Sequence, residues 1–505
     1  MALSGFAARI YDHCNKYGLL TDTGAIVCGL SGGPDSVALI SVLHELTEEY
    51  EDLPLIFAVH VNHGLRDNAD NDEKLCIRLC EDLCIPLKVF HFDVRAESKS
   101  MGRGLEETGR LLRYRAFNEY ADEISRDLDM PGKKVRIATA HHKGDLAETF
   151  MMNLYRGAGL DGLTAMTGDP GIIRPLLGSS KEEILRYLGG GNILFATDET
   201  NFQSDYTRNK WRNDIFPLIG EVSVKDPQEA VYDTYMLLKA DADYLKETAR
   251  EEFERIRVKE GGRIFIDGSC ISGLHEAVVT RIIRMLWKDT FGSLTDFENK
   301  HVDIVRELAA AKDGTRYADM PFGRMCVCTE GLIGFCPGDG KDGLSCAMST
   351  YMGFPAALAD PDIEVCAADL SSGPKTVFLE DPGVLISVSI VENNDAIVYN
   401  THSWVCAADF LRITAQPLEG TFRRAGSPYS KDIRKILSDM KVPRDARSHL
   451  ISVRKDDEIL WIPGIGHAKG FISERSRELW LKEDGNSGKA RLIKIELARK
   501  GDMLG

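Results

Sequence analysis

The stretch SGGPDS at residues 31–36 combines residue types that together hold a phosphate group. It follows a short apolar run that predicts a strand, and it opens a helical pattern. Glycine lets the backbone approach a phosphate closely, and the amide groups and dipole of a helix N-terminus attract anions. The serine hydroxyls add donors, and the aspartate can hold Mg²⁺. The predicted phosphate-binding residues are Ser31, Gly32, Gly33, Pro34, Asp35 and Ser36, and Asp35 is also the predicted metal ligand.

The same loop has no lysine in the Walker position, because the pattern G-x-x-x-x-G-K-[ST] is absent. It therefore lacks the usual means of transferring a γ-phosphate. The alternative interpretation is a surface turn that caps a helix with Ser and Asp side chains. The order of strand, loop and helix favours the phosphate site.

Two histidines and two carboxylates lie close together in HHKGDLAET at residues 141–149. Asp145 and Glu148 are three residues apart on a starting helix, so they share a face. Such a pair can bind Mg²⁺ or a substrate ammonium group, although acidic residues at a helix N-terminus also complement its dipole. His141 and His142 follow a buried strand, and a pair at that position favours a functional role over a structural one. The predicted catalytic residues are Asp35, Asp145, Glu148, His141 and His142.

Arginines beside these segments are candidates for phosphate contacts. Arg156 begins a glycine-rich turn, RGAGLDGL, that suits a ligand or an RNA backbone. Arg110 and Arg113 share a helix face, for which a solvated, salt-bridged surface is the alternative. Arg208 and Arg212 are four residues apart and would face together toward the phosphates of a nucleotide or an RNA.

Positive charge is concentrated between residues 420 and 455, in a chain whose formal net charge is −16. This local reversal predicts a polyanion-binding surface, with a coincidental solvated face as the alternative. The basic residues of the stretch are Arg423, Arg424, Lys431, Arg434, Lys435, Lys441, Arg444, Arg447, Arg454 and Lys455.

The elements that would position these residues alternate between strands and helices over the first 215 residues. The pattern predicts strands at 26–29, 55–61, 87–92 and 135–140, and helices at 36–46, 71–83, 105–124 and 144–155. This order implies an α/β fold with a doubly wound parallel sheet. Ligands of such sheets bind beyond the C-terminal ends of the strands. The segments that fall there are 31–36, 60–66, 97–115 and 140–145.

We predict four regions along the chain. Residues 1–218 form the α/β catalytic domain, and residues 219–336 form a small helical domain closed by a strand pair, because helical periodicity replaces the alternation. Residues 337–383 are rich in Gly, Pro, Ser and Asp, which predicts a linker or an insertion. Residues 384–485 form a C-terminal α+β domain with one helix at 430–440.

Composition excludes several classes of protein. With 505 residues, of which 43% are hydrophobic, the chain can bury substantial cores, yet it has no apolar run long enough for a membrane span. Residues 6–17 predict a helix and not a signal peptide, so we expect a cytoplasmic protein. The twelve cysteines include no C-x-x-C pair, which argues against a zinc or redox centre.

The motifs in this order resemble the bacterial tRNA(Ile)-lysidine synthetase family, a branch of the N-type ATP-pyrophosphatases with a PP-loop. The resemblance covers nearly the whole chain except about residues 337–383. The motifs that carry it are SGGPDS (31–36), HVNHGLR (60–66), HHKGDLAET (141–149), NLYRGAGLDGL (153–163), RPLL (174–177), DETNFQSDYTRNKWR (198–212), the stretch GTFRRAGSPYSKDIRKILSDMKVPRDARSHLISV (420–453) and DEILWIPG (457–464).

The resemblance implies an enzyme that activates C2 of the wobble cytidine of a CAU-anticodon tRNA(Ile) with ATP and Mg²⁺. Pyrophosphate leaves, and the ε-amino group of L-lysine then displaces AMP to give lysidine. On this basis, Asp145 and Glu148 would hold and deprotonate the lysine ammonium group. The domains at 219–336 and 384–485 would bind the tRNA arms. The family also suggests a homodimer. The further residues assigned to the nucleotide are His60, Asn62, Arg113 and Arg208, and those assigned to tRNA are Arg156, Arg212, Arg423, Arg424, Lys431, Arg434, Lys435 and Arg444.

Two positions depart from the family pattern. Leu146 stands where the family usually has Gln, which puts in doubt any polar contact there. The family's Asp-x-Ser-Asn reads DETN at residues 198–201, a mild change.

Three other functions would each account for part of the sequence. An ATP-pyrophosphatase that adenylates a tRNA base for sulfur transfer is disfavoured by the missing C-x-x-C pairs. An amidotransferase-type synthetase acting on a small carboxylate would leave the C-terminal basic region unexplained. A tRNA-binding protein with an inactive nucleotide site is disfavoured by the intact SGGPDS loop and the pair of Asp145 and Glu148.

Overall fold

The computed structural model groups the chain into two compact units, Met1–Asp243 and Tyr244–Gly505. None of its described helices is both long and apolar enough to cross a bilayer. The residues described are 3–64, 69–128, 134–169, 171–196, 206–310, 314–379, 384–390, 403–407, 410–425, 427–468 and 492–499.

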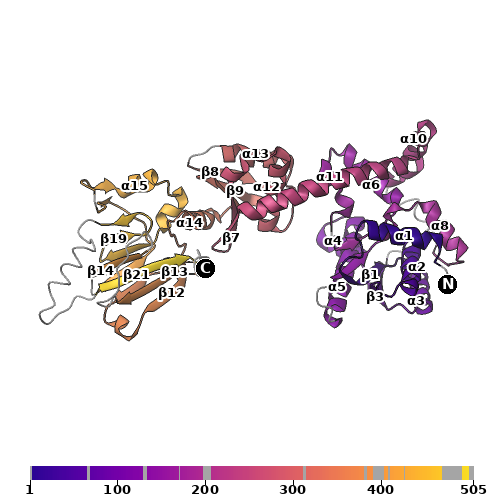
Figure 1. Cartoon of the computed structure of the whole chain (residues 1–505), viewed down its shortest axis with the longest axis horizontal. Coiled ribbons are helices and arrows are strands. Elements are labelled where there is room, and N and C mark those ends of the chain that lie inside the picture. The colour runs from indigo at the N-terminus through magenta and orange to yellow at the C-terminus, as the bar shows by residue number, and fades with distance from the viewer. Residues whose placement is uncertain are drawn as a thin grey trace. The chain divides into compact units, whose positions relative to one another are not determined.

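The first unit is built on a five-stranded sheet in the order β3-β2-β1-β4-β5, whose paired strands are all parallel. Figure 1 shows it in indigo and purple, with helices packed around it. This sheet confirms the predicted doubly wound fold, and each of the four expected strands is present. The strands are β1 (Thr23–Gly29), β2 (Leu55–Asn62), β3 (Leu87–His91), β4 (Lys134–Ala138) and β5 (Ile172–Ile173).

Both faces of the sheet are buried because successive side chains of a strand point to opposite sides. On β1, Ile26 and Cys28 belong to the core cluster that includes residues of α1 (Gly5–Lys16) and α2 (Pro34–Glu49). Ala25 and Val27 belong to a second cluster, which contains Phe117, Tyr120 and Ile124. The other long helices of the first unit up to residue 190 are α3 (Ala69–Asp82), α4 (Val94–Met101), α5 (Leu105–Asp127), α6 (Lys143–Tyr155) and α8 (Lys181–Gly190).

Short helical pieces complete the first unit and lead into a long helix. They are α7 (Leu160–Leu163), the 3-10 turn η2 (Pro175–Gly178), α9 (Tyr206–Lys210), the π-helical turn η4 (Trp211–Ile215) and α10 (Phe216–Val222). The long helix α11 (Pro227–Ile256) has 30 residues and contains the boundary between the units.

The second unit begins with an antiparallel five-stranded sheet in the order β6-β7-β10-β9-β8. The helical periodicity of this region corresponds to α12 (Glu276–Phe291) and α13 (Asn299–Ala310), together with α11. The expected strand pair is part of a larger sheet, because β6 and β7 are short and rich in charged residues, which hides them from pattern analysis. The strands are β6 (Arg257–Glu260), β7 (Arg263–Asp267), β8 (Thr315–Met320), β9 (Arg324–Thr329) and β10 (Leu332–Pro337).

Residues 337–383 were predicted to be a linker or an insertion, and their described part contains a helix and two longer strands. They contain α14 (Lys341–Tyr351), β11 (Ile363–Cys366) and β12 (Lys375–Leu379). Helix α14 is buried over most of its circumference, including the small polar side chains of Ser345 and Ser349. A helix buried all round has no polar face, so its sequence shows no amphipathic period.

Two further sheets face each other in the C-terminal part, and the rings of Trp404 and Trp461 stack between them with centroids 6.0 Å apart. Their orders are β11-β15-β18-β19-β20 and β12-β13-β21-β14. The additional strands are β13 (Val384–Ile390), β14 (Ser403–Ala407), β15 (Phe410–Thr414), β18 (Ser452–Lys455), β19 (Glu458–Ile462), β20 (Gly466–His467) and β21 (Leu492–Arg499). A short pair, β16 (Thr421–Phe422) and β17 (Lys431–Asp432), precedes α15 (Ile433–Asp439).

Candidate active site

The SGGPDS loop connects the C-terminal end of β1 to the start of α2. Gly32 has φ +86°, a conformation that only glycine adopts without strain. Gly33 is the extended N-cap of α2, and Pro34 occupies its first turn. A proline fits there because the first N–H groups of a helix have no partner within the helix. The amide groups that follow are thus directed at the space in front of the loop.

The two serines of the loop hold its shape. The Ser36 hydroxyl accepts a hydrogen bond from the Ser31 amide at 3.1 Å and donates one to the Gly33 carbonyl at 3.0 Å. The hydroxyl oxygens of Ser31 and Ser36 are also 3.1 Å apart. Ser36 is buried and Ser31 is exposed, so Ser31 is the one available to a ligand.

His60 and Asn62, at the end of β2, support the loop from the neighbouring strand. The buried ring of His60 donates from Nδ1 to the carbonyl of Leu30, 2.8 Å away and directly before Ser31. The amide of Asn62 donates to Glu73 at 2.9 Å, and its oxygen accepts from the backbone of Gly64 at 3.0 Å. Nδ1 of His60 and the side-chain amide of Asn62 are thus engaged with the protein. Their predicted contact with the nucleotide stays a prediction.

His142, which was predicted to be catalytic, is the N-cap of helix α6. Its Nδ1 accepts a hydrogen bond from the Gly144 amide at 3.0 Å, while the Asp145 carboxylate accepts one from the His142 amide at 3.0 Å. A side chain on Gly144 would meet the His142 ring at 2.8 Å, so the cap requires glycine. The sequence did not reveal this role because histidine is not among the preferred capping residues.

Glu148 lies on the same helix face as Asp145, as the spacing predicted, and both meet Arg212. The Arg212 Nε donates to Glu148 Oε1 at 2.6 Å, and its Nη2 lies 3.4 Å from Asp145 Oδ1. Arg212 is in the π-helical turn η4, which is held against α6 by the packing of Trp211 and Phe216 on Ala147. Arg212 had been assigned to tRNA. In this structure, the packing of Trp211 on α6 directs the Arg212 guanidinium to the two carboxylates.

The two carboxylates have opposite pKa shifts. Burial raises the pKa of Glu148 and outweighs the attraction of Arg212. Burial also acts to raise the pKa of Asp145, but His142, His141, the backbone N–H of His142 and Arg212 together lower it. Asp145 is thus a stable anion and Glu148 a better proton acceptor, a division typical of acid–base pairs.

His141 follows β4 and points toward the same group of residues. Burial lowers the pKa of His141 to about 4, and the positive charges of Arg174, Arg110 and Arg208 act in the same direction. Its Nδ1 is 2.9 Å from the Thr139 hydroxyl. The ring is therefore neutral near pH 7. Arg208 also lies near Glu148, since its charge acts on that carboxylate.

Asp35, in the phosphate loop, forms an ion pair that the sequence did not suggest. Lys181 Nζ, from the first residue of α8, is 2.6 Å from Asp35 Oδ1. The charge of Asp35 also acts on Arg212, which places the loop beside the pair of Asp145 and Glu148. Lys181 could not be found from pattern analysis, because it lies 146 positions from its partner.

Asp35 fits a role as a magnesium ligand. Within the described ranges no three His, Cys, Asp or Glu residues gather as a metal site. Mg²⁺ in nucleotide sites is usually held by one or two carboxylates together with substrate phosphates and water. A single carboxylate next to an anion-binding loop matches that donor set.

Two further predicted arginines, Arg113 and Arg156, are exposed on helices of the first unit. Arg113 is exposed on α5, and Arg156 is exposed at the C-terminal end of α6. Arg156 is eleven residues from Asp145, which is about 16 Å along a helix axis. Arg156 is thus too far away to share a small substrate with Asp145. The predicted segment at 198–201 lies outside the described residues.

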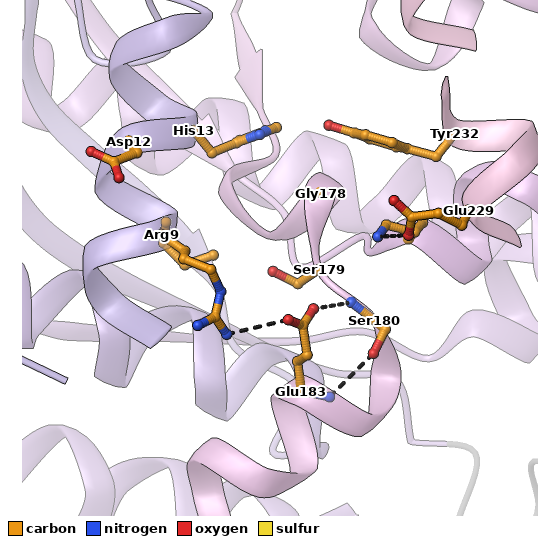
Figure 2. Close-up of a pocket in the computed structure, with 11 residues that line it drawn as sticks. Arg9, Asp12, His13, Gly178, Ser179, Ser180, Glu183, Glu229 and Tyr232 are labelled. Carbon is orange, nitrogen blue, oxygen red and sulfur yellow. Dashed lines mark hydrogen bonds and ion pairs between the residues drawn. The ribbon is translucent and has the colours of Figure 1, made fainter. Parts of the chain in front are cut away.

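A cavity of about 540 Å³ lies on another side of the start of α6, within the first unit. Figure 2 shows the pairing of Arg9 with Glu183 in it. Lys143 pairs with Glu229 there as well. Its lining residues are Arg9, Ile10, Asp12, His13, Lys143, Gly178, Ser179, Ser180, Glu183, Glu229 and Tyr232. Asp35, Asp145 and Glu148 are not among them, so this cavity is separate from the group around Arg212.

The predicted basic surface lies in the second unit, around α15. Lys431, Arg434 and Lys435 are exposed there, and Lys431 pairs with Asp439. Arg424 and Arg444 are exposed as well. The Arg423 guanidinium donates to the carbonyls of Ser427 at 3.3 Å and Pro428 at 3.0 Å, so it holds its own loop.

Comparison with known proteins finds two family models in the chain. A PP-loop domain model matches residues 5–219. A TilS substrate C-terminal domain model matches residues 411–483. The first match contains the SGGPDS loop, the two carboxylates and Arg212, and the second contains α15 and the basic residues around it.

Curated relatives match over most of the chain. A tRNA(Ile)-lysidine synthase from Caldanaerobacter subterraneus subsp. tengcongensis is 27% identical over 480 residues, which are 94% of this chain and 96% of the relative. Proteins of the same name from Clostridioides difficile and Petrotoga mobilis are 34% and 33% identical. These two matches cover 59% and 52% of this chain, and 64% and 79% of the relatives.

Proposed function

Since the chain belongs to the tRNA(Ile)-lysidine synthase family, we propose how its residues carry out that reaction. The enzyme uses ATP to ligate lysine to C2 of the wobble cytidine of a CAU-anticodon tRNA(Ile). In the first half-reaction, the cytidine is adenylated and pyrophosphate leaves. In the second, the ε-amino group of lysine displaces AMP and forms lysidine.

The SGGPDS loop grips the part of ATP that departs. Its free amide groups and the N-terminus of α2 stabilise the negative charge that builds up on the leaving pyrophosphate. Ser31 adds an exposed hydroxyl donor. A loop that holds a leaving pyrophosphate has no need to transfer a γ-phosphate, which accounts for the missing Walker lysine.

Mg²⁺ bound at Asp35 would neutralise phosphate charge. Asp35 is the only loop residue with a side-chain carboxylate, so this residue and the phosphates themselves would provide the coordination. Every other role in the proposal belongs to the protein's own backbone and side chains.

Asp145 and Glu148 receive the lysine ammonium group. Asp145, whose pKa is lowered, stays ionised and holds the cation, while Glu148, whose pKa is raised by burial, takes the proton. The ammonium group would replace Arg212 as the partner of these carboxylates. Arg212 and Arg208 would then be released toward the phosphates of the nucleotide or of the tRNA.

One observation carries this proposal, the convergence on Arg212 of carboxylates from two catalytic segments. Glu148 and Asp145 lie 2.6 Å and 3.4 Å from its guanidinium, and the charge of Asp35 acts on it as well. A nucleotide held at the loop would thus have its reacting phosphate beside the site for the lysine amine.

The test is the transfer of labelled lysine to a tRNA(Ile) transcript in the presence of ATP and Mg²⁺. We expect lysine to be incorporated into this transcript and not into a transcript of unrelated anticodon. Tight binding of the tRNA without any transfer would instead favour a protein with an inactive nucleotide site.

The larger surfaces and the setting are also part of the proposal. The basic residues around α15 would contact tRNA phosphates, with Arg156 as a further contact. Because its substrates are tRNA and ATP, the enzyme would work in the cytoplasm. A homodimer is proposed from the family resemblance, and light scattering of the purified chain measures its mass directly.

A further inference from the structure

We propose that Lys181 binds the β- and γ-phosphates of ATP and then the leaving pyrophosphate. It would supply, from a separate helix, the positive charge that the SGGPDS loop lacks. This inference rests on the proposed function, since it assigns a residue to the first half-reaction.

The first argument is the position of the ammonium group. Lys181 Nζ is 2.6 Å from Asp35 Oδ1, and the side chains are 36% and 30% exposed. Asp35 belongs to the first turn of α2, next to the amide groups that face the phosphate position. The lysine thus reaches the loop itself.

The second argument is that the start of α8 is held in place from several sides. Ser180 caps the helix in a capping box with Glu183, shown in Figure 2, and Glu183 also pairs with Arg9 of α1. The Lys143 amide donates to the carbonyl of Ser179 at 3.0 Å. Past the helix, the Ala196 amide donates to the carbonyl of Gly32 at 2.9 Å. Helix α8 is therefore bracketed by hydrogen bonds to both catalytic segments.

The third argument is charge. Residues 31–36 contain no cationic side chain, although the loop faces a triphosphate. Without that ligand, the ammonium group pairs with the nearest carboxylate, Asp35. When ATP arrives with Mg²⁺, Asp35 faces the metal ion, and the flexible stem of Lys181 lets its charge turn to the phosphates. Lysine commonly binds phosphate in this way, as a point charge.

The competing explanation is that Lys181 only forms a structural ion pair with Asp35. Partly exposed ion pairs contribute little to stability. If that were its whole role, removing the ammonium group would leave phosphate affinity unchanged. The two explanations therefore differ in what happens to pyrophosphate binding.

The experiment compares Lys181→Met and Lys181→Arg with the wild type, by calorimetric titration with inorganic pyrophosphate, ATP and AMP in the presence of Mg²⁺. For Lys181→Met we expect the affinity for pyrophosphate and ATP to fall about 10- to 100-fold, the effect of losing a charged hydrogen bond. The affinity for AMP should not change, because AMP lacks the β- and γ-phosphates. Lys181→Arg should recover most of the loss.

Lys88→Met is the matched control, since Lys88 is 31% exposed and pairs with Glu123 away from the loop. It should bind all three ligands like the wild type. Unchanged pyrophosphate affinity in Lys181→Met would overturn the inference, and so would an equal loss for AMP. If the wild type itself bound neither ATP nor pyrophosphate, the proposed function would fail, and this inference with it.

Discussion

At the scale of single residues, Glu148 is a carboxylate with little access to water. Its side chain is 2% exposed, burial raises its pKa, and Arg212 is its ion-pair partner. Buried carboxylates with shifted pKa values are typical of catalytic sites, although structural ion pairs shift them too. Substitution can separate the two roles.

We predict that Glu148→Gln lowers lysine incorporation about 100-fold or more, because an amide cannot accept the ammonium proton. Binding of ATP should persist, since the phosphate loop is unchanged. Labelled-lysine transfer and ATP–pyrophosphate exchange measure the two halves separately. Glu123→Gln, which removes a carboxylate from an ion pair elsewhere in the first unit, is the control. If both assays gave wild-type values for Glu148→Gln, Glu148 would have no part in the reaction.

The lowered pKa values of two histidines predict how the stability of the fold depends on pH. Burial lowers the pKa of both His13 and His141 to about 4 in the folded chain, from 6.5 for a free side chain. Between pH 6.5 and 4 the unfolded chain therefore binds protons that the folded chain does not, so stability falls as the pH falls. It is at its full value above pH 6.5.

The measurement is the melting temperature between pH 7.5 and 4.5. His13→Asn should show a smaller loss than the wild type, because one of the two groups no longer titrates. His91→Asn, which changes an exposed histidine, should follow the wild-type curve. Identical curves for His13→Asn and the wild type would contradict the prediction.

At the scale of elements, the active site depends on where helices begin. Helices α2, α6 and α8 start near the ion pairs of Asp35 and Asp145. Their N-caps are Gly33, His142 and Ser180. Each helix presents its positive end there, which favours a polyanionic ligand. The loop before α2 depends on one backbone conformation, that of Gly32 at φ +86°.

We predict that Gly32→Ala weakens binding of ATP and pyrophosphate about 10-fold or more while the fold persists. A side chain at this φ costs about 1–2 kcal/mol. The added methyl group would meet its nearest neighbour, Cys76 Sγ, at 3.4 Å, so no severe clash adds to that cost. The strain would instead be relieved by turning the loop amides away from the phosphates.

Gly102→Ala is the control, because Gly102 has φ +63° with nothing near its missing side chain. It ends α4, away from the loop. Both variants should lose a few degrees of melting temperature, but only Gly32→Ala should lose phosphate affinity. Calorimetric titration and thermal unfolding provide the two readings. If Gly32→Ala and Gly102→Ala bound ATP and pyrophosphate equally well, the positive φ of Gly32 would not be needed for phosphate binding.

At the scale of the whole molecule, the proposed catalytic residues and the most basic segment belong to different units of the chain. The proposed nucleotide and lysine sites belong to the first unit, and the basic residues around α15 belong to the second. The chain as a whole has a net charge of −16, which disfavours nonspecific attraction to RNA. The basic residues around α15 are therefore the part of the second unit expected to attract RNA.

We predict that Arg434→Ala weakens the binding of any tRNA and lowers the salt dependence of binding by about one ion in the log–log slope. Arg434 is exposed on α15. Lys375→Ala, which removes an exposed charge from β12, is the control. Filter binding at several salt concentrations gives both quantities. An equal effect of the two variants would point to total charge and not to this surface.

The sequence by itself determined the parallel sheet, the phosphate loop and the shared face of Asp145 and Glu148. These features are local, because each depends on residues close together in the sequence. They are the strand and helix periods, the glycines of a turn and a spacing of three residues. It did not reveal α14, because a helix buried all round has no polar face to produce a period.

Only the tertiary structure decided which side chains meet. Lys181 and Asp35 are 146 residues apart in sequence, and Arg212 and Glu148 are 64 apart. No local pattern encodes such pairs, because they follow from how the buried faces of whole elements pack. The packing of Trp211 on α6 directed Arg212 to the carboxylates, and the cap of α6 engaged His142.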